Sequence, residues 1–245
     1  MKEVVLSKRL QALADMVTPG RCVVDVGCDH GFVSIYLIQK KISPRVLAMD
    51  VREGPLSRAR EHIKEYGLER YIETRLSDGL REYQEGEVQG LICAGMGGRL
   101  MTRILTESRK KARELSELIL QPQSELSVFR SFLRREGYIL IDENIVFEEG
   151  KYYFLMKVAY QGEAVAQKQI KQAKEDVYTK LYDSYGELLI KRKNPLLKRY
   201  LEENLQSLKK LESVLLQNDK ERARKRLCEI QEEIGNLQQA LALMV

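Results

Sequence analysis

Four aspartates, each in or just after a short apolar run, are the residues of this sequence best suited to bind a ligand. Asp25 and Asp29 stand on either side of Gly27 in "DVGCDHG", Asp50 closes the run "VLAMD", and Asp78 is the acid of "SDG". Carboxylates accept hydrogen bonds and attract positive charge. Together these residues predict a ligand that carries hydroxyl groups, an amino group and a cationic centre.

The glycine turn after the first run separates two classes of nucleotide ligand. A dinucleotide-binding turn has the pattern G-x-G-x-x-G, and its second glycine lets the backbone approach the pyrophosphate. Here that position is Asp29, and its carboxylate would repel a phosphate in a partly buried site. S-adenosylmethionine has a sulfonium, an ammonium and a ribose but no phosphate. The turn therefore favours this ligand over NAD.

Three further strand ends agree with that ligand. Asp50 is placed to accept both ribose hydroxyls, a feature that NAD sites share, and Asp78 is placed to meet the adenine amino group. "AGMGG", Ala94–Gly98, ends the fourth run with glycines that permit close approach of the backbone. Each turn alone is typical of an ordinary Gly/Asp loop. Four of them at successive strand ends indicate a site at the carboxyl edge of a sheet.

The elements that must position these turns alternate along the first 160 residues. Helices are expected at Phe32–Lys41, at Pro55–Tyr66, after Gly98 and at Leu126–Glu136. Such alternation predicts an α/β fold with a mostly parallel sheet covered on both faces. The expected strands are Cys22–Gly27, Val46–Asp50, Tyr71–Ser77, Val88–Ala94, Leu118–Gln121, Tyr138–Phe147 and Tyr152–Val158.

The last two apolar runs, Tyr138–Phe147 and Lys151–Tyr160, are separated only by "EEG". They must therefore form a hairpin, which makes one strand antiparallel. A parallel sheet that ends in a hairpin is typical of the Rossmann-like sheet of class I methyltransferases, whereas dinucleotide-binding domains are usually parallel to the edge.

After Tyr160 the composition changes to Lys, Glu, Gln and Leu without strand signals. Apolar residues in steps of three and four predict three helices, divided at "KNP" (Lys193–Pro195) and "QND" (Gln217–Asp219), that pack as a coiled coil. We expect a cofactor-binding domain in residues 1–160 and an all-α coiled-coil domain in residues 161–245. The pattern leaves open whether this arm binds substrate or serves as a structural or dimerising appendage.

Composition narrows the class of protein. The 245 residues are 44% hydrophobic and carry a formal charge of +5, so a folded core is expected. No signal peptide or membrane span is apparent, which predicts a cytoplasmic protein. The four cysteines have no zinc-ligand spacing, so no metal site is expected and the thiols are interpreted as reduced packing residues. Basic residues cluster around residues 99–113, 191–199 and 222–226, which indicates a polyanionic partner.

Several motifs, taken in order, resemble one bacterial family. They are "LSKRL" (Leu6–Leu10), "DVGCDHG", "MD" at Met49–Asp50, "SDGL" at Ser77–Leu80, "GMGG" at Gly95–Gly98 and "LQPQSE" at Leu120–Glu125. The family is that of the tRNA (adenine-N1)-methyltransferases that modify adenine 22 in the D-arm. The resemblance covers nearly the whole chain. It implies a class I methyltransferase domain with S-adenosylmethionine as donor, a coiled-coil domain, and tRNA as substrate.

The resemblance also implies roles for particular residues. Asp29 would face the reacting end and stabilise the charge that develops on the adenine, with general-base action as a second possible role. His30 and the aromatic Phe32 and Tyr36 are interpreted mainly as packing residues, and His62 as exposed. The expected cofactor-binding residues are Lys8, Arg9, Asp25, Gly27, Cys28, His30, Gly31, Asp50, Val51, Asp78, Gly79, Ala94, Gly95, Met96, Gly97, Gln121 and Pro122.

The Asn/Asp-Pro-Pro-aromatic motif of amino-group methyltransferases is absent at the fourth strand, where "AGMGG" stands. This agrees with attack by a ring nitrogen rather than an exocyclic amine. Two alternatives stay open at this point: an NAD(P)-binding oxidoreductase on the same sheet, and a non-catalytic adaptor that recruits a partner through its coiled coil.

Overall fold

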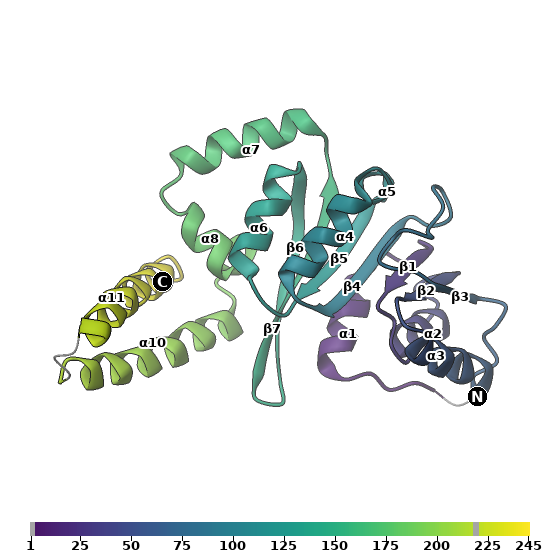
Figure 1. The fold of residues 1–245 in the computed structure, drawn as a ribbon, viewed down its shortest axis with the longest axis horizontal. Helices are drawn as coiled ribbons and strands as arrows, with labels where there is room; N and C mark the ends of the chain where they lie inside the picture. Colours follow the sequence, from purple (N-terminus) through teal and green to yellow (C-terminus); the bar gives the residue numbers. More distant parts are fainter. Residues whose placement is uncertain (1–2, 218–220) are drawn as a thin grey trace. The chain divides into compact units, whose positions relative to one another are not determined.

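A seven-stranded sheet forms the centre of the computed structural model, which describes residues 3–217 and 221–245 (Figure 1). The strand order is β3-β2-β1-β4-β5-β7-β6, and every pair from β3 to β5 is parallel. The predicted mostly parallel α/β sheet is therefore confirmed. The strands are β1 (Val23–Val26), β2 (Val46–Asp50), β3 (Ile72–Leu76), β4 (Gly90–Met96), β5 (Glu117–Pro122), β6 (Tyr138–Glu148) and β7 (Lys151–Tyr160).

Helices cover both faces of the sheet because successive residues of each buried strand point to opposite sides. Val23 packs in the core beneath α1, α2 and α3, whereas Val24 packs in the core beneath α4, α5 and α6. The helices are α1 (Lys8–Asp15), α2 (Phe32–Gln39), α3 (Glu53–Glu65), α4 (Gly98–Glu107), α5 (Arg109–Glu114) and α6 (Leu126–Arg135).

The strand order creates a crevice at the carboxyl ends of β1 and β4. β1 pairs with β2 on one side and with β4 on the other, so the crossovers on its two sides run in opposite directions. Ligands of open α/β sheets bind at such a switch point. Asp25 lies near the end of β1, Asp50 ends β2 and Asp78 follows β3, so all three lie at this edge.

The predicted hairpin is confirmed, and it places β7 between β5 and β6. β7 is antiparallel to both neighbours. Glu149 (φ +48°) and Gly150 (φ +78°) form its turn, and glycine adopts such an angle without a steric penalty. The end of the hairpin lies against α1, so this antiparallel edge helps to position the first helix.

A buried carboxylate at the amino-terminal end of β5 binds the segment that follows α1. Glu117 at the start of β5 is fully buried and accepts hydrogen bonds from the Thr18 backbone N–H at 2.9 Å and from Lys157 Nζ. Arg21 donates at 2.8 Å to Oε2, the oxygen that Lys157 also contacts. Burial raises the pKa of Glu117, but these hydrogen bonds hold the pKa below its usual value. The carboxylate therefore stays ionised and anchors Thr18, which follows α1.

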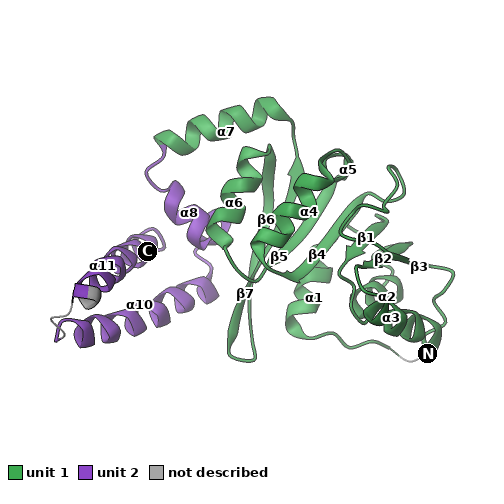
Figure 2. Ribbon diagram, viewed as in Figure 1, with its two compact units in different colours: residues 1–175 green, residues 176–245 purple. Residues whose placement is uncertain are grey.

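The chain divides into two compact units, Met1–Glu175 and Asp176–Val245 (Figure 2). α7 (Glu163–Glu175) belongs to the first unit. The second contains α8 (Thr179–Tyr185), α9 (Glu187–Lys191), α10 (Pro195–Leu215) and α11 (Glu221–Ala242). The boundaries predicted for the two domains stay a prediction.

The prediction of a single helix between Tyr160 and "KNP" was wrong, because the structure has α7, α8 and α9 there. The Asp176 carboxylate accepts a hydrogen bond from the Tyr178 N–H at 2.8 Å and so closes a turn after α7, and Gly186 (φ +97°) separates α8 from α9. Val177, an apolar residue between α7 and α8, is 82% exposed.

α10 and α11 do pack together, with Leu197, Leu201, Ile230 and Ile234 buried. The break at "QND" beyond Gln217 and the side chains of Arg222 and Ala223 lie outside the described residues. Among the helices that the structure describes, none combines the length and apolar character needed to cross a membrane.

Candidate active site

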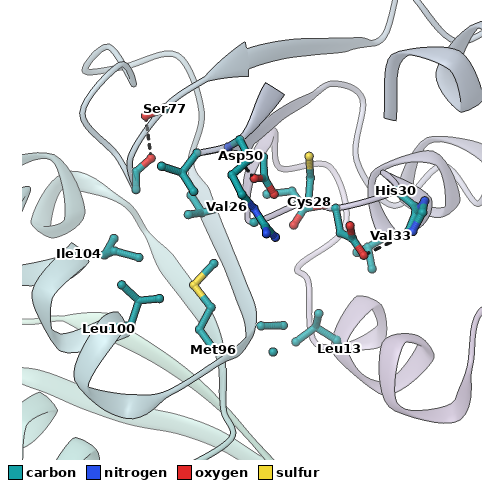
Figure 3. A pocket seen from close by; sticks show the side chains of 18 of the residues that line it. Leu13, Val26, Cys28, His30, Val33, Asp50, Ser77, Met96, Leu100 and Ile104 are labelled. Carbon is teal, nitrogen blue, oxygen red and sulfur yellow. Dashed lines mark hydrogen bonds and ion pairs between the residues drawn. The ribbon is translucent and has the colours of Figure 1, made fainter. Parts of the chain in front are cut away.

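A cavity of about 720 Å³ opens at the carboxyl ends of β1, β2, β3 and β4. Figure 3 shows its two kinds of wall: Leu13, Met96, Leu100 and Ile104 contribute apolar side chains, and Asp50 and His30 contribute polar ones. Its size and mixed lining are those of a small-molecule site. We therefore take this cavity as the candidate active site.

The glycine turn after β1 forms one wall. Gly27 has φ +76° and Asp29 has φ +48°, and the N–H groups of Gly27 and Cys28 donate to the Met49 carbonyl at 2.8 and 3.0 Å. A Cβ at Gly27 would lie 2.3 Å from Met96 Cε. The backbone angle therefore favours glycine, whereas the Met96 methyl is the end of a flexible side chain that could move aside.

Asp25 lies at the base of the cavity, 5% exposed. Its Oδ2 accepts a hydrogen bond from the Ser34 hydroxyl of α2 at 2.7 Å. Burial raises the pKa of Asp25 to about 6, with the Ser34 hydrogen bond lowering it and the nearby Asp50 raising it. Burial also raises the pKa of the Cys28 thiol, so this cysteine is no nucleophile at neutral pH.

Asp50 ends β2 and is 7% exposed. Its Oδ1 accepts a hydrogen bond from the backbone N–H of Arg52 at 2.9 Å, which fixes the carboxylate at the start of α3. The next residue, Val51, also lines the cavity and is 59% exposed. A carboxylate held in this way can accept two hydrogen bonds from vicinal hydroxyl groups of a ligand.

Asp78, after β3, is engaged by an arginine that sequence analysis had not placed in the site. Arg103 of α4 donates to both carboxylate oxygens, at 3.0 and 3.2 Å. This bidentate contact is the first of the causes that lower the pKa of Asp78. Arg103 lines the cavity as well, so any ligand amino group that reaches Asp78 meets a carboxylate that is already paired.

Asp29 lies at the mouth of the cavity, with its side chain 62% exposed. The Arg58 guanidinium is 3.7 Å from its Oδ1, and His30 Nε2 is 3.6 Å from its Oδ2.

The His30 carbonyl lies 2.9 Å from Nδ1 of His62. The expectation that His62 is exposed was wrong, because its ring stacks on Phe32 at 4.7 Å between centroids and is half-buried. Phe32 lines the cavity and is half-buried too.

A bulge in β4 connects the site to β5. The β4–β5 register shifts between Ala94 and Met96, so Gly95 (φ +75°) is left out of the ladder. Its N–H instead donates to the side-chain Oε1 of Gln121 at 3.2 Å, and this oxygen also accepts from Arg9 at 2.9 Å. Bulges next to active sites aim side chains in this way.

Most of the predicted site residues line the cavity together, although their roles stay predictions. Those that line it are Arg9, Asp25, Gly27, Cys28, Asp29, His30, Asp50, Val51, Asp78, Gly79, Ala94, Gly95 and Met96. Lys8, Gly31, Gly97, Gln121 and Pro122 do not; Gln121 acts behind the wall through Gly95 and Arg9.

Sequence analysis had not assigned eleven lining residues to the site. They are Leu10, Leu13, Val26, Phe32, Val33, Arg52, Ser77, Leu100, Arg103, Ile104 and Gln123. The helical ones among them lie near the sheet edge on α1, α2 and α4. The apolar spacing of α1 and α4 is a signal for Leu10, Leu13, Leu100 and Ile104, whereas α2 is apolar on all sides and gives no such signal.

Comparisons with known proteins agree with this site. A family model described as a methyltransferase domain matches residues 6–156. The tRNA (adenine(22)-N(1))-methyltransferase of Bacillus subtilis (strain 168) is 31% identical over 242 residues, which are 98% of this chain and 99% of that protein.

Solved structures show the same likeness. The crystal structure of the B. subtilis m1A22 tRNA methyltransferase TrmK has a TM-score of 0.81 at 28% identity and covers 98% of this chain and 100% of that one. A putative tRNA (m1A22) methyltransferase of Streptococcus pneumoniae, in complex with S-adenosyl-L-methionine, has a TM-score of 0.80 at 28% identity, covering 97% and 100%. This chain belongs to the methyltransferase-domain family and, within it, to the tRNA (adenine(22)-N(1))-methyltransferases.

Proposed function

We propose that this protein transfers a methyl group from S-adenosyl-L-methionine to N1 of adenine 22 in tRNA. The full-length likeness to the B. subtilis enzyme supports the reaction, and the S-adenosyl-L-methionine complex of the S. pneumoniae relative supports the donor. The observation that carries the proposal in this chain is the set of four carboxylates, Asp25, Asp29, Asp50 and Asp78, around one cavity.

These residues fit a cationic donor with a ribose and no phosphate. Asp50 would accept the ribose hydroxyls, and the buried Asp25 would face positive charge that compensates its own. The positive φ of Gly27 lets the turn pass close to the ligand without a side chain in the way. The bound donor supplies an electrophilic methyl group on a sulfonium.

The acceptor makes modest chemical demands on this chain. Adenine N1 has a lone pair, so no proton has to leave before it attacks, and the protein's main tasks are alignment and exclusion of water. Leu13, Leu100 and Ile104 provide the apolar wall. Because N1 lies on the Watson–Crick edge, the nucleotide must leave its pairing or stacking, as bases do in other enzymes that act on them.

Positive charge develops on the adenine as the methyl group arrives. Asp29, at the cavity mouth, is the carboxylate that would accept a hydrogen bond from the N6 amino group and stabilise that charge. The Arg58 guanidinium and His30 Nε2 lie near it at 3.7 and 3.6 Å. Neither contact is a hydrogen bond, so the carboxylate stays free to accept one from a ligand.

Asp29→Asn tests this role, because asparagine tolerates the left-handed backbone of residue 29 and removes only the charge. We expect turnover on unmodified tRNA to fall about 100-fold, with S-adenosylhomocysteine affinity nearly unchanged. The site of methylation is mapped by mass spectrometry of the digested tRNA. Glu61→Gln, an equal charge change on the exposed face of α3, is the control. Full turnover by the Asp29→Asn variant would remove Asp29 from the mechanism.

The helices of the second unit would supply the tRNA-binding charge. Lys209 and Lys210 on α10 and Lys225 on α11 are exposed, and such side chains bind phosphates with a steep dependence on salt. Changing the three to alanine should weaken tRNA binding about tenfold or more at low salt and reduce the salt slope by about 2 to 3, while donor affinity stays unchanged. An unaltered tRNA affinity would argue for a purely structural arm.

Family membership disfavours the two alternatives left open by the sequence. An oxidoreductase would need a pyrophosphate beside Asp29, and a non-catalytic adaptor would need no ordered donor site.

A further inference from the structure

Three arginines line the active-site cavity, Arg9, Arg52 and Arg103, and Arg9 is the half-buried one of the three. Arg103 is paired with Asp78, and Arg58 lies 3.7 Å from Asp29. Among the described residues, no carboxylate lies within ion-pair distance of the Arg9 guanidinium. Its partners are neutral: the side-chain oxygen of Gln121 at 2.9 Å and the ring of Tyr153, whose centroid is 5.2 Å from Arg9 Cζ.

These neutral partners hold Arg9 in one place. Gln121 is fully buried, and the same oxygen accepts the Gly95 N–H, so its orientation is fixed by the bulge of β4. Tyr153 is half-buried on β7 and packs with the residues beneath α1. The Glu148 carboxylate at the end of β6 accepts the backbone N–H of Arg9 at 3.3 Å. Main chain and side chain of Arg9 are thus both held, from β5 and from the β6–β7 hairpin.

A half-buried guanidinium with neutral partners leaves a positive charge that a ligand can compensate. Arg9 lines the cavity, and a Cβ at Gly95 would be 4.0 Å from its Nη1. An arginine whose rotamer is already fixed loses little further freedom when it binds an anion. The arrangement is therefore that of a prepared oxyanion-binding group.

We propose that Tyr153 is a positioning residue that acts through Arg9, and that Arg9 binds an oxyanion of a ligand in the cavity. The oxyanion is either the carboxylate at the amino-acid end of the donor or a phosphate of the target nucleotide. This inference rests on the proposed function, which supplies both ligands. The β6–β7 hairpin would then contribute to the reaction, because Glu148 and Tyr153 position Arg9 on α1.

The test compares Arg9→Ala, Tyr153→Leu and the double variant in the full-length protein. Tyr153→Leu keeps apolar bulk but removes the ring face, Tyr153→Phe restores the face, and Tyr152→Leu is the matched control on the same strand. Binding of S-adenosylhomocysteine and of 5′-methylthioadenosine, which lacks the carboxylate, is measured by calorimetry. KM and kcat for tRNA are measured separately, and melting temperatures show whether each variant is folded.

We expect Arg9→Ala to lower the affinity for S-adenosylhomocysteine, or to raise KM for tRNA, about tenfold or more. Tyr153→Leu should change the same quantity about fivefold. The double variant should be no worse than Arg9→Ala, since Tyr153 acts through Arg9. Tyr153→Phe and Tyr152→Leu should bind as the unchanged protein does. If the donor carboxylate is bound, only S-adenosylhomocysteine is affected. If a phosphate is bound, KM for tRNA rises with kcat maintained while both nucleosides bind normally.

Two results would overturn the proposal. In one, Arg9→Ala changes neither donor binding nor the KM for tRNA. In the other, the Tyr153→Leu effect persists in full when Arg9 is already alanine, which would mean that Tyr153 acts on the fold alone. Failure of the proposed function would be distinguishable, because the unchanged protein would then show no tRNA turnover while the donor-binding arm could still be measured.

Discussion

The four carboxylates of the active site fall into two pairs with different surroundings. Asp25 and Asp50 are 5% and 7% exposed and have neutral hydrogen-bond donors, the Ser34 hydroxyl and the Arg52 backbone N–H. Asp29 and Asp78 have side chains that are 62% and 28% exposed and lie beside arginines. Four aspartates at the ends of three strands thus have surroundings suited to different roles.

The difference lies in what compensates the charge. Neutral donors orient Asp25 and Asp50 but leave their charge for a cationic ligand to balance, and a buried charge gains most from such a partner. Asp78 already has a bidentate arginine partner and Asp29 has a more distant one, and solvent screens both interactions. We therefore expect the buried pair to contribute most to donor affinity, and the exposed pair to exchange partners when a substrate binds.

The largest effect is expected from the buried pair. Asp50→Asn removes one acceptor oxygen and the charge, so S-adenosylhomocysteine affinity should fall about 30-fold or more, because hydrogen bonds to charged groups are each worth about 1.5–3 kcal/mol. Calorimetry measures the change. Glu53→Gln makes the same charge change three residues away at an exposed position of α3 and should have no effect. Equal affinity for both variants would remove the distinction between the pairs.

A smaller effect is expected at Asp78, where the comparison can be sharpened. Asp78→Asn should weaken S-adenosylhomocysteine binding about fivefold, since one neutral hydrogen bond to a ligand amino group is worth about 1 kcal/mol. Arg103→Ala should change it less than about threefold if the pair is exchangeable. An Arg103→Ala loss equal to that of Asp78→Asn would show instead that Arg103 positions the carboxylate.

The smallest effect concerns pH. Because burial raises the pKa of Asp25 to about 6, the ligand-free protein holds a proton there below that pH. Binding of the cationic donor should strengthen as pH rises from 5 to 7, and Asp25→Asn should flatten this profile. Ser34→Ala removes the hydrogen bond that lowers the pKa, so the midpoint should move upward. Ser108→Ala, buried outside the lining of the cavity, is the control; an unmoved midpoint in Ser34→Ala would contradict the assignment.

The raised pKa of Asp25 also determines how the stability of the ligand-free protein changes with pH. Between the unfolded value of 3.8 and about 6, folded Asp25 binds more protons than the unfolded chain does. The free energy of unfolding contributed by this group therefore falls as pH rises through that window. A bound cationic donor reverses this by favouring the ionised form, so ligand stabilisation should grow over the same range.

Sequence patterns predicted the parts of the fold that depend on neighbouring residues. The alternation of runs located seven strands, and "EEG" located the hairpin. The same patterns failed in the segment before "KNP", where apolar spacing continues through a turn closed by the Asp176 side chain. Spacing records which residues are apolar, but it does not record a side chain that competes with the helix for backbone hydrogen bonds.

The sequence by itself determined the sheet, the positions of the glycine turns and the four acids that end in one cavity. These follow from strand periodicity and from the backbone angles that only a few residue types adopt. Tertiary structure alone decided that Arg103 meets Asp78 and that Arg9 meets Gln121 and Tyr153. Those contacts join distant segments, so they depend on strand register and helix orientation, which no local pattern in the chain encodes.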